Sequence, residues 1–168
     1  MYRRIIESLK KWKESPRRKP LILQGARQTG KTWIMKEFGR TEYKNTAYLF
    51  CQENPALKSL FEAPFDKERL LNGFQLLCGF KIEAENTLII IDEIQDIPKA
   101  ITSLKFFYEQ APEYHIICAG SLLGVSLCEG ISFPVGKVNF LNLYPLSFSE
   151  FLMAIGKGQY ESLINSKT

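Results

Sequence analysis

One loop of this sequence has the residue types and spacing needed to bind phosphate. It follows the pattern Gly-x-x-x-x-Gly-Lys-Thr and consists of Gly25, Ala26, Arg27, Gln28, Thr29, Gly30, Lys31 and Thr32, with Trp33 directly after it. Glycines let the backbone bend so that N–H groups point at phosphate oxygens, and a following helix adds its positive amino end. We therefore expect the segment 25–33 to bind a nucleotide, with Lys31 reaching the β- and γ-phosphates and Thr32 giving a hydroxyl to Mg²⁺.

Two adjacent carboxylates follow the most apolar strand candidate. Asp92 and Glu93 come directly after the run 88–91. A phosphate loop needs a second carboxylate near Mg²⁺ at the end of a buried strand, which is the place of Asp92. Glu93 is placed to orient or deprotonate a water that attacks the γ-phosphorus. The pair favours hydrolysis over transfer to a small molecule, with Thr32 and Asp92 as metal ligands and Lys31 and Glu93 as catalytic residues.

Each motif also has a plainer interpretation. The glycine loop is an ordinary strand-to-helix turn in that case, and the acidic pair is surface polarity after a strand. The first is disfavoured because the full glycine, lysine and threonine pattern lies between a predicted strand and a predicted helix, the context that phosphate binding requires. The second is disfavoured because this loop lies upstream of the acidic pair.

The elements that must position these groups alternate between strand and helix. Apolar runs predict strands at 21–24, 46–50, 87–91, 114–119 and 139–143. Helical spacing and capping predict helices at 2–12, 33–38, 57–77 with a break near Pro64, behind Pro98, and at 147–153. This alternation predicts an α/β fold with a largely parallel sheet and helices on both faces.

Three parts of the chain can be separated. We expect residues 1–19 to form a helix and a basic linker that pack on the core, and residues 20–155 to form the ATP-binding core. Residues 156–168 are expected to be a linker, since Gly156-Lys157-Gly158 breaks the last helix. The linker is expected to lead into a further C-terminal region.

Composition and charge exclude several classes of protein. The hydrophobic share of 45% and charged share of 24% are those of an ordinary globular chain. No apolar run approaches the roughly 20 residues that cross a bilayer, so we expect no membrane contact and a cytoplasmic location. The net charge of +4 is too mild to indicate nucleic acid. The basic stretch 10–19 is better explained as a solvated helix end and linker, although it could face phosphates.

The cysteines predict neither a zinc site nor a disulfide framework. Cys51, Cys78, Cys118 and Cys128 show no Cys-x-x-Cys spacing, and His115 is the single histidine. Cys118 lies in an apolar run and is expected to be a buried thiol.

Four segments carry a family resemblance: 23–32, 90–95, 119–123 and 143–152. They resemble the AAA+ superfamily, and most closely a prokaryotic AAA+ ATPase family that carries a C-terminal domain of unknown function. The glycine loop is shared widely. The Asp-Glu-Ile-Gln run and the Tyr-Pro-Leu-Ser-Phe-x-Glu-Phe run are much more specific. The resemblance covers nearly all of the chain.

The resemblance implies a P-loop NTPase fold, a three-layer sandwich whose five-stranded sheet has the order 5-1-4-3-2. It makes Ser121 a catalytic sensor that contacts the γ-phosphate or the attacking water, whereas without it Ser121 would be a simple helix cap. It makes Arg3, Arg4 and Ile5 candidates for adenine contacts, although packing and solvated surface explain these residues equally well.

One departure weakens the catalytic interpretation. The family often has Gly-Arg before the fifth strand, and this chain has Gly136-Lys137. Lysine lacks the planar two-point contact of arginine, so turnover by this core alone is expected to be slow.

Two functions from different classes remain open, and a third, a DNA-binding or DNA-processing protein driven by this core, rests only on the family resemblance and the basic N-terminal stretch. The first is a core that hydrolyses ATP with Mg²⁺ to drive a conformational change. The second is a nucleotide-gated switch in which bound ATP locks an arrangement of domains and turnover is negligible. The expected partners are ATP and the further C-terminal region, with a protein or DNA as a possible partner and an oligomer as a possible assembly.

Overall fold

The computed structural model describes residues 3–120, 133–160 and 163, and its elements alternate as the sequence predicts. In chain order they are α1 (Ile5–Glu14), β1 (Leu21–Gln24), α2 (Lys31–Glu42), β2 (Asn45–Phe50), α3 (Pro55–Glu62), α4 (Lys67–Cys78), β3 (Thr87–Asp92), the 3-10 helix η1 (Ile94–Asp96), α5 (Pro98–Gln110), β4 (His115–Ala119), β5 (Asn139–Asn142), α6 (Phe148–Ala154) and the 3-10 helix η3 (Gly158–Tyr160).

The five strands form one sheet in the order β2-β3-β4-β1-β5. This is the expected order 5-1-4-3-2 read from the other edge. Neighbouring strands pair in parallel throughout, so their carboxyl ends lie along one edge of the sheet. The predicted α/β class and P-loop NTPase topology are confirmed.

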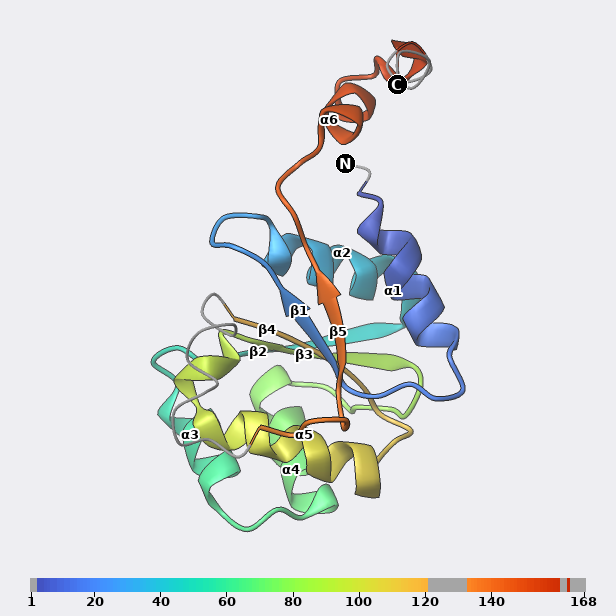
Figure 1. Cartoon of the computed structure of the whole chain (residues 1–168). Coiled ribbons are helices and arrows are strands. Elements are labelled where there is room, and N and C mark those ends of the chain that lie inside the picture. The colour runs from blue at the N-terminus through green and yellow to red at the C-terminus, as the bar shows by residue number, and fades with distance from the viewer. Residues whose placement is uncertain (1–2, 121–132, 161–162, 164–168) are drawn as a thin grey trace.

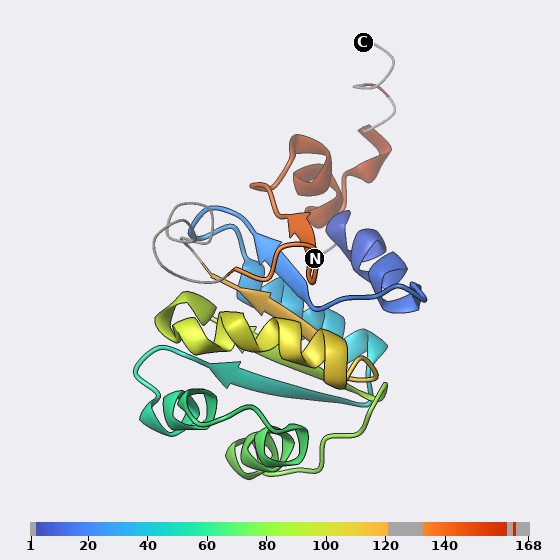
Figure 2. The same cartoon turned by 60° about the horizontal axis from the view of Figure 1, so that its bottom comes forward.

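Helices cover both faces of the sheet and make three layers (Figures 1 and 2). The side chains of α1 and α2 pack on one face, against Leu21, Leu23, Leu88 and Ile90. Those of α3, α4 and α5 pack on the other face, against alternate residues of the same strands. Burial on both faces explains the continuous apolar runs of β1 and β3.

Local capping sets several helix boundaries. The side chain of Asn54 accepts a hydrogen bond from the Leu57 amide at the start of α3, and Asp66 accepts one from the Arg69 amide at the start of α4. Between them the chain is not helical, which confirms the predicted break near Pro64. The capping box of Ser147 and Glu150 at the start of α6 is also confirmed.

The helix after the glycine loop begins two residues earlier than predicted. Apolar spacing placed its start at Trp33, whereas α2 begins at Lys31. Gly30 precedes it with φ of 89°, a left-handed conformation that glycine adopts without strain. The loop therefore turns directly into the helix, and its lysine and threonine belong to the first helical turn.

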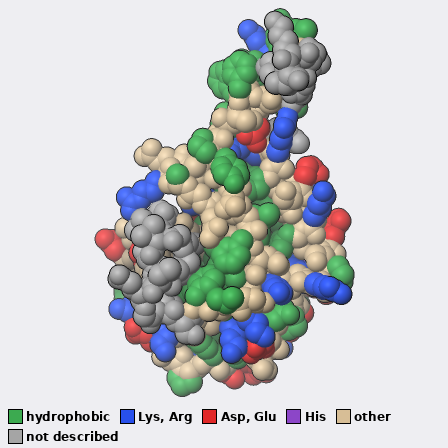
Figure 3. Space-filling model, viewed as in Figure 1, with side chains coloured by type: hydrophobic (Ala, Val, Ile, Leu, Met, Phe, Trp, Pro, Cys, Tyr) green, Lys and Arg blue, Asp and Glu red, His purple; other side chains and the backbone are tan. Residues whose placement is uncertain are grey.

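The last helix projects from the body of the domain. Figure 1 shows α6 beyond the end of β5, near the amino end of the chain. Tyr144, Phe148 and Phe151 expose 70%, 63% and 45% of their surface, and hydrophobic side chains are visible on this projecting part in Figure 3. The division into 1–19, 20–155 and 156–168 stays a prediction.

Three of the four cysteines lie in the described part of the chain and are free thiols: Cys51, Cys78 and Cys118. Cys118 is fully buried, as expected. In the residues that the structure describes, no helix has both the length and the apolar character to span a membrane.

Candidate nucleotide-binding site

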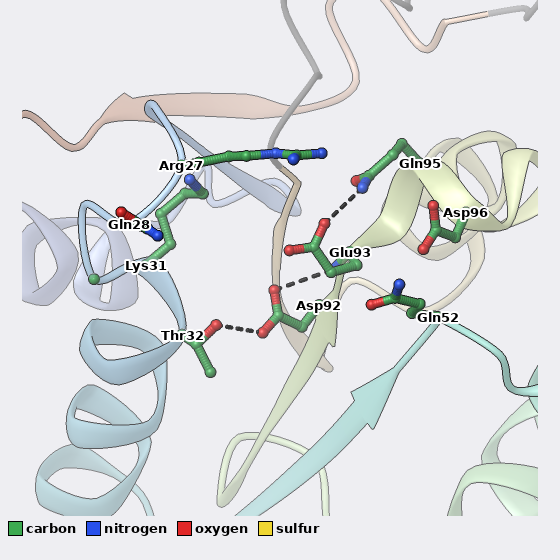
Figure 4. A pocket seen from close by; sticks show the side chains of 10 residues that line it. Arg27, Gln28, Lys31, Thr32, Gln52, Asp92, Glu93, Gln95 and Asp96 are labelled. Atoms are coloured by element: carbon green, nitrogen blue, oxygen red, sulfur yellow. Dashed lines mark hydrogen bonds between the residues drawn. The ribbon is translucent and has the colours of Figure 1, made fainter.

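Both sequence motifs open onto one polar pocket of about 480 Å³ at the carboxyl edge of the sheet. Its lining comes from the glycine loop, the start of α2, the end of β3 and the segment after β2: Arg27, Gln28, Gly30, Lys31, Thr32, Gln52, Asp92, Glu93, Gln95 and Asp96 (Figure 4). Motifs that are 60 residues apart in the sequence thus meet because β1 and β3 point the same way.

The glycine loop is held in a closed curve by its own groups. The Thr29 hydroxyl donates a hydrogen bond of 2.8 Å to the Ala26 carbonyl. Gly25 lies against the chain that follows β5, where a Cβ would collide with the Leu143 carbonyl oxygen. Gln28 has φ of 62°, a conformation that side-chain-bearing residues rarely adopt. Such strain is typical of loops shaped for a ligand.

Lys31 folds back along the loop. Its ammonium group donates hydrogen bonds of 2.8 Å and 2.6 Å to the carbonyls of Gly25 and Ala26. Burial lowers the pKa of Lys31, and the nearby carboxylates of Glu93 and Asp92 act in the opposite direction. A phosphate in the pocket would also favour the charged form of this lysine.

Thr32 and Asp92 join the loop helix to β3. The Thr32 hydroxyl donates a hydrogen bond of 2.6 Å to Oδ2 of Asp92, and the Glu93 amide donates one of 3.0 Å to Oδ1 (Figure 4). Asp92 is only 3% exposed, so its carboxylate is held in one orientation by these donors. The predicted pair of metal ligands therefore lies in direct contact.

Glu93 sits on a strained backbone at the rim of the pocket. Its φ of 50° and ψ of 46° are left-handed, which is unfavourable for a residue with a side chain. The side-chain amide of Gln95 donates a hydrogen bond of 2.6 Å from Nε2 to Oε2 of Glu93. This hydrogen bond holds the Glu93 carboxylate, which lines the pocket (Figure 4).

Four contributions were not predicted from the sequence. Gln52, Gln95 and Asp96 line the pocket, and Tyr48 donates a hydrogen bond of 2.8 Å to Asp92. Gln95 lies in the Asp-Glu-Ile-Gln run, and this motif was the one sequence signal that could have indicated a residue of the site outside the predicted set. Tyr48 and Gln52 reach the site only because β2 pairs with β3.

Other predicted residues lie elsewhere. Ser121 falls outside the described residues. Trp33 is 40% exposed and is not among the lining residues, so its role stays a prediction. Lys137 pairs with Glu109 at 3.3 Å, and its ammonium lies 5.4 Å from the Tyr108 ring, away from the pocket.

The adenine candidates border a second cavity of about 320 Å³. Arg3, Arg4 and Ile5 line it together with the chain 141–150. The Arg3 guanidinium, buried to 4% exposure, donates to the carbonyls of Thr29 and Tyr144 at 3.5 Å and 2.6 Å. It also pairs with Glu150 at 3.4 Å. Arg3 therefore ties the glycine loop to α6.

The basic stretch 10–19 has contacts that a solvated linker would not need. Lys13 donates to the Glu42 carbonyl, Arg18 to the carbonyls of Lys13 and Pro112, and Lys19 to that of Gly136. The bonds to Glu42, Pro112 and Gly136 fasten the segment to the body of the domain.

A sequence model described as an AAA domain matches residues 17–152, which is most of the chain. The chain belongs to this AAA domain family. No curated protein matches it. The shared AAA domain spans the glycine loop, the acidic pair and the capping box of α6, so the resemblance inferred from these motifs is confirmed at the level of a P-loop NTPase domain.

Solved structures with the same fold include Pif1 of Bacteroides sp in complex with ADP-AlF4, with a TM-score of 0.54 and 19% identity over 93% of this chain. The ORC1 protein of Aeropyrum pernix in complex with DNA aligns with a TM-score of 0.51 and 20% identity over 95% of this chain. This chain spans 45% and 48% of the length of those two chains. At this identity the likeness is one of fold.

Proposed function

We propose that this AAA domain binds ATP with Mg²⁺ and hydrolyses it to drive a conformational change. The observation that carries the proposal is the meeting of Lys31, Thr32, Asp92 and Glu93 at one pocket, from two motifs on different strands. A phosphate-binding loop, a metal-binding pair and a base are the parts that phosphoryl transfer to water requires.

Phosphate binding is assigned to the loop and to Lys31. The amides at 25–33 would face the phosphate oxygens at the amino end of α2. Lys31 would exchange its bonds to the Gly25 and Ala26 carbonyls for bonds to the β- and γ-phosphates. Because those bonds already place the ammonium beside the loop, the exchange needs only side-chain rotation.

The donor set fits Mg²⁺. The Thr32 hydroxyl donates a hydrogen bond to Asp92, which leaves the lone pairs of the threonine oxygen for a metal ion. Among the described residues no group of three or more Asp, Glu, His or Cys could hold a metal ion. Mg²⁺ suits a site with few protein ligands, because it keeps several waters and binds phosphate oxygens. When bound, it would neutralise charge on the β- and γ-phosphate oxygens.

Glu93 is assigned as the base that accepts a proton from the attacking water. Its bond to Gln95 holds the carboxylate at the pocket. Ser121 is proposed to sense the γ-phosphate, as the family resemblance implies. The cavity beside Arg3, Arg4 and Ile5 is the proposed place of the adenine base.

The first test is the thermal midpoint with and without saturating ATP·Mg²⁺, for the wild type and Lys31→Ala. Ligand at 100 times its Kd adds ~2.7 kcal/mol, which raises the midpoint by about 5–10 °C at this chain length. We expect that rise in the wild type and its loss in Lys31→Ala. An equal rise in both proteins would refute the assigned role of Lys31.

The nucleotide-gated switch is the second candidate, and the contacts of Arg3 favour it. Arg3 joins the Thr29 carbonyl of the loop to Glu150 of α6, so a loop that moves on nucleotide binding would act on α6. Phosphate release in a single turnover separates the two candidates. Release within minutes supports hydrolysis as the function, whereas tight binding without release over hours supports the switch.

The wider setting of the domain is also proposed rather than observed. A further C-terminal region would receive the movement of α6, and an oligomer could supply the arginine that position 137 lacks. A DNA or protein partner, a cytoplasmic location and a slow turnover of the isolated domain remain predictions.

A further inference from the structure

Two hydroxyl groups converge on the same oxygen of Asp92. Oδ2 accepts hydrogen bonds from Thr32 Oγ1 at 2.6 Å and from Tyr48 Oη at 2.8 Å, while Oδ1 accepts one from the Glu93 amide. Thr32 and Glu93 belong to the two motifs, and Tyr48 belongs to neither. The tyrosine is therefore an additional donor that β2 brings to the site.

The register of the sheet places Tyr48 where it can reach Asp92. Tyr48 pairs with Ile90, and Phe50 pairs with Asp92, so the tyrosine is one pleat away from the carboxylate on the neighbouring strand. Side chains two residues apart share a face of the sheet. Tyr48 accordingly packs with Ile90 and the α2 side chains on the face that Asp92 shares.

The ring of Tyr48 is fixed from two sides. The Lys36 ammonium lies 3.9 Å from the ring centroid, and the Phe50 ring stacks beside it at 6.4 Å and 11°. Lys36 is one helical turn beyond Thr32, so α2 supplies both a donor to Asp92 and the cation above the tyrosine. This arrangement leaves the hydroxyl little freedom to turn away from Asp92.

The Tyr48 hydroxyl donates to a charged acceptor, the carboxylate of Asp92. A hydrogen bond to a carboxylate is shorter and stronger than one between neutral groups.

We propose that Tyr48 is a positioning residue for Mg²⁺: it holds Asp92 so that Oδ2 accepts a hydrogen bond from the Thr32 hydroxyl, which leaves the lone pairs of the threonine oxygen free to bind the metal. The inference rests on the proposed function, because it concerns how that site binds its metal. Partners that orient metal ligands set metal affinity even though they do not touch the ion.

The test uses Tyr48→Phe, which keeps the ring, its packing and the contact with Lys36 and removes only the hydroxyl. ATP binding is measured by fluorescence anisotropy of a labelled ATP analogue, first with EDTA and then over a range of Mg²⁺ concentrations. We expect unchanged binding in EDTA and a 10–100-fold rise in the Mg²⁺ concentration at half-maximal enhancement. Phosphate release should recover at saturating Mg²⁺.

Tyr43→Phe is the matched control. Tyr43 also uses its hydroxyl in a side-chain hydrogen bond, to Nδ1 of His115, but it precedes β2 and lies at the other end of the sheet. Its removal should leave the Mg²⁺ dependence unchanged. Circular dichroism and the thermal midpoint without ligand establish that both variants are folded.

Three results would overturn the inference: an unchanged Mg²⁺ midpoint in Tyr48→Phe, an equal shift in Tyr43→Phe, or a loss of binding in EDTA as well. The last result would mean that the tyrosine supports the pocket as a whole. A wild type that binds no ATP in EDTA or in Mg²⁺ refutes the proposed function itself, and this is seen before any variant is compared.

Discussion

At the carboxyl end of the sheet, Tyr48 donates to Asp92 beside an open pocket, and at the amino end of β4, Tyr43 shares a hydrogen bond of 2.7 Å with His115. In the second pair, aromatic rings pack against His115. Trp12 and Tyr43 meet the His115 ring edge-on, with centroids 6.1 Å and 5.4 Å away. Similar hydrogen bonds thus lie in two different environments: the first is polar and open, and the second is closed.

The difference follows from what surrounds each pair. Around Asp92 lie further carboxylates, Lys31 and the strained loop. These groups line a pocket that a charged ligand can enter. Around His115, burial removes water, and the charges of Arg18 and Lys13 add to the effect, so its pKa falls to about 4. We infer that changes at the first pair alter ligand binding and catalysis, whereas changes at the second alter stability.

The largest expected effect is at the carboxyl end. Glu93→Gln removes the proposed base but keeps a side chain of the same shape, so phosphate release should fall by about 10²–10⁴-fold. The thermal midpoint with ATP·Mg²⁺ should rise as in the wild type. Release at the wild-type rate would mean that another group activates the water.

The next effect belongs to the amino end and depends on pH. The pKa of His115 is about 4 in the fold, against ~6.5 when unfolded, so the unfolded chain binds the extra proton between these values. The contribution of His115 to the free energy of unfolding, about 3 kcal/mol in all, is therefore present above pH 6.5 and is lost as pH falls to 4.

The measurement is the free energy of unfolding in urea from pH 7 to pH 4, for the wild type and His115→Gln. The difference in free energy of unfolding between the two proteins should narrow from pH 7 to pH 4. The wild type loses the contribution of His115 over this range, whereas glutamine does not titrate. Parallel pH profiles would show that His115 gains its proton as easily in the fold as in the unfolded chain.

A smaller effect is expected from Tyr43→Phe. It leaves Nδ1 of a buried histidine without its tyrosine partner, and losing one such hydrogen bond costs about 1–3 kcal/mol. Urea unfolding should show this loss while ATP affinity stays the same. A change in ATP affinity would contradict the inference that changes at the His115 pair alter stability and leave ligand binding unchanged.

The smallest effect is predicted for Lys137→Ala. Its ion pair with Glu109 is more than a third exposed on each side, and such pairs contribute roughly 0–1 kcal/mol. Stability should change by no more than about 0.5 kcal/mol, and phosphate release should not change. A tenfold fall in release would give Lys137 a catalytic role that its place in the fold does not suggest.

Much of the fold could be predicted because its signals are local. The apolar runs of β1 and β3, the break near Pro64 and the capping box at Ser147 each depend on a few neighbouring residues. The start of α2 was misplaced by two residues because hydrophobic spacing begins at Trp33, whereas the helix begins where Gly30 ends the loop. The strand order came from family resemblance, since spacing alone does not rank strands.

The sequence by itself determined the chemistry of this AAA domain: a glycine loop with lysine and threonine, and an aspartate and glutamate after a buried strand. Backbone conformation and side-chain type are local properties, so a motif reveals them. Only the tertiary structure decided which residues from outside the motifs join the site. Tyr48 reaches Asp92 through parallel pairing of β2 with β3, and Arg3 joins the loop to α6 across 26 and 147 residues of chain. Such contacts depend on register and packing between distant segments, which no local pattern encodes.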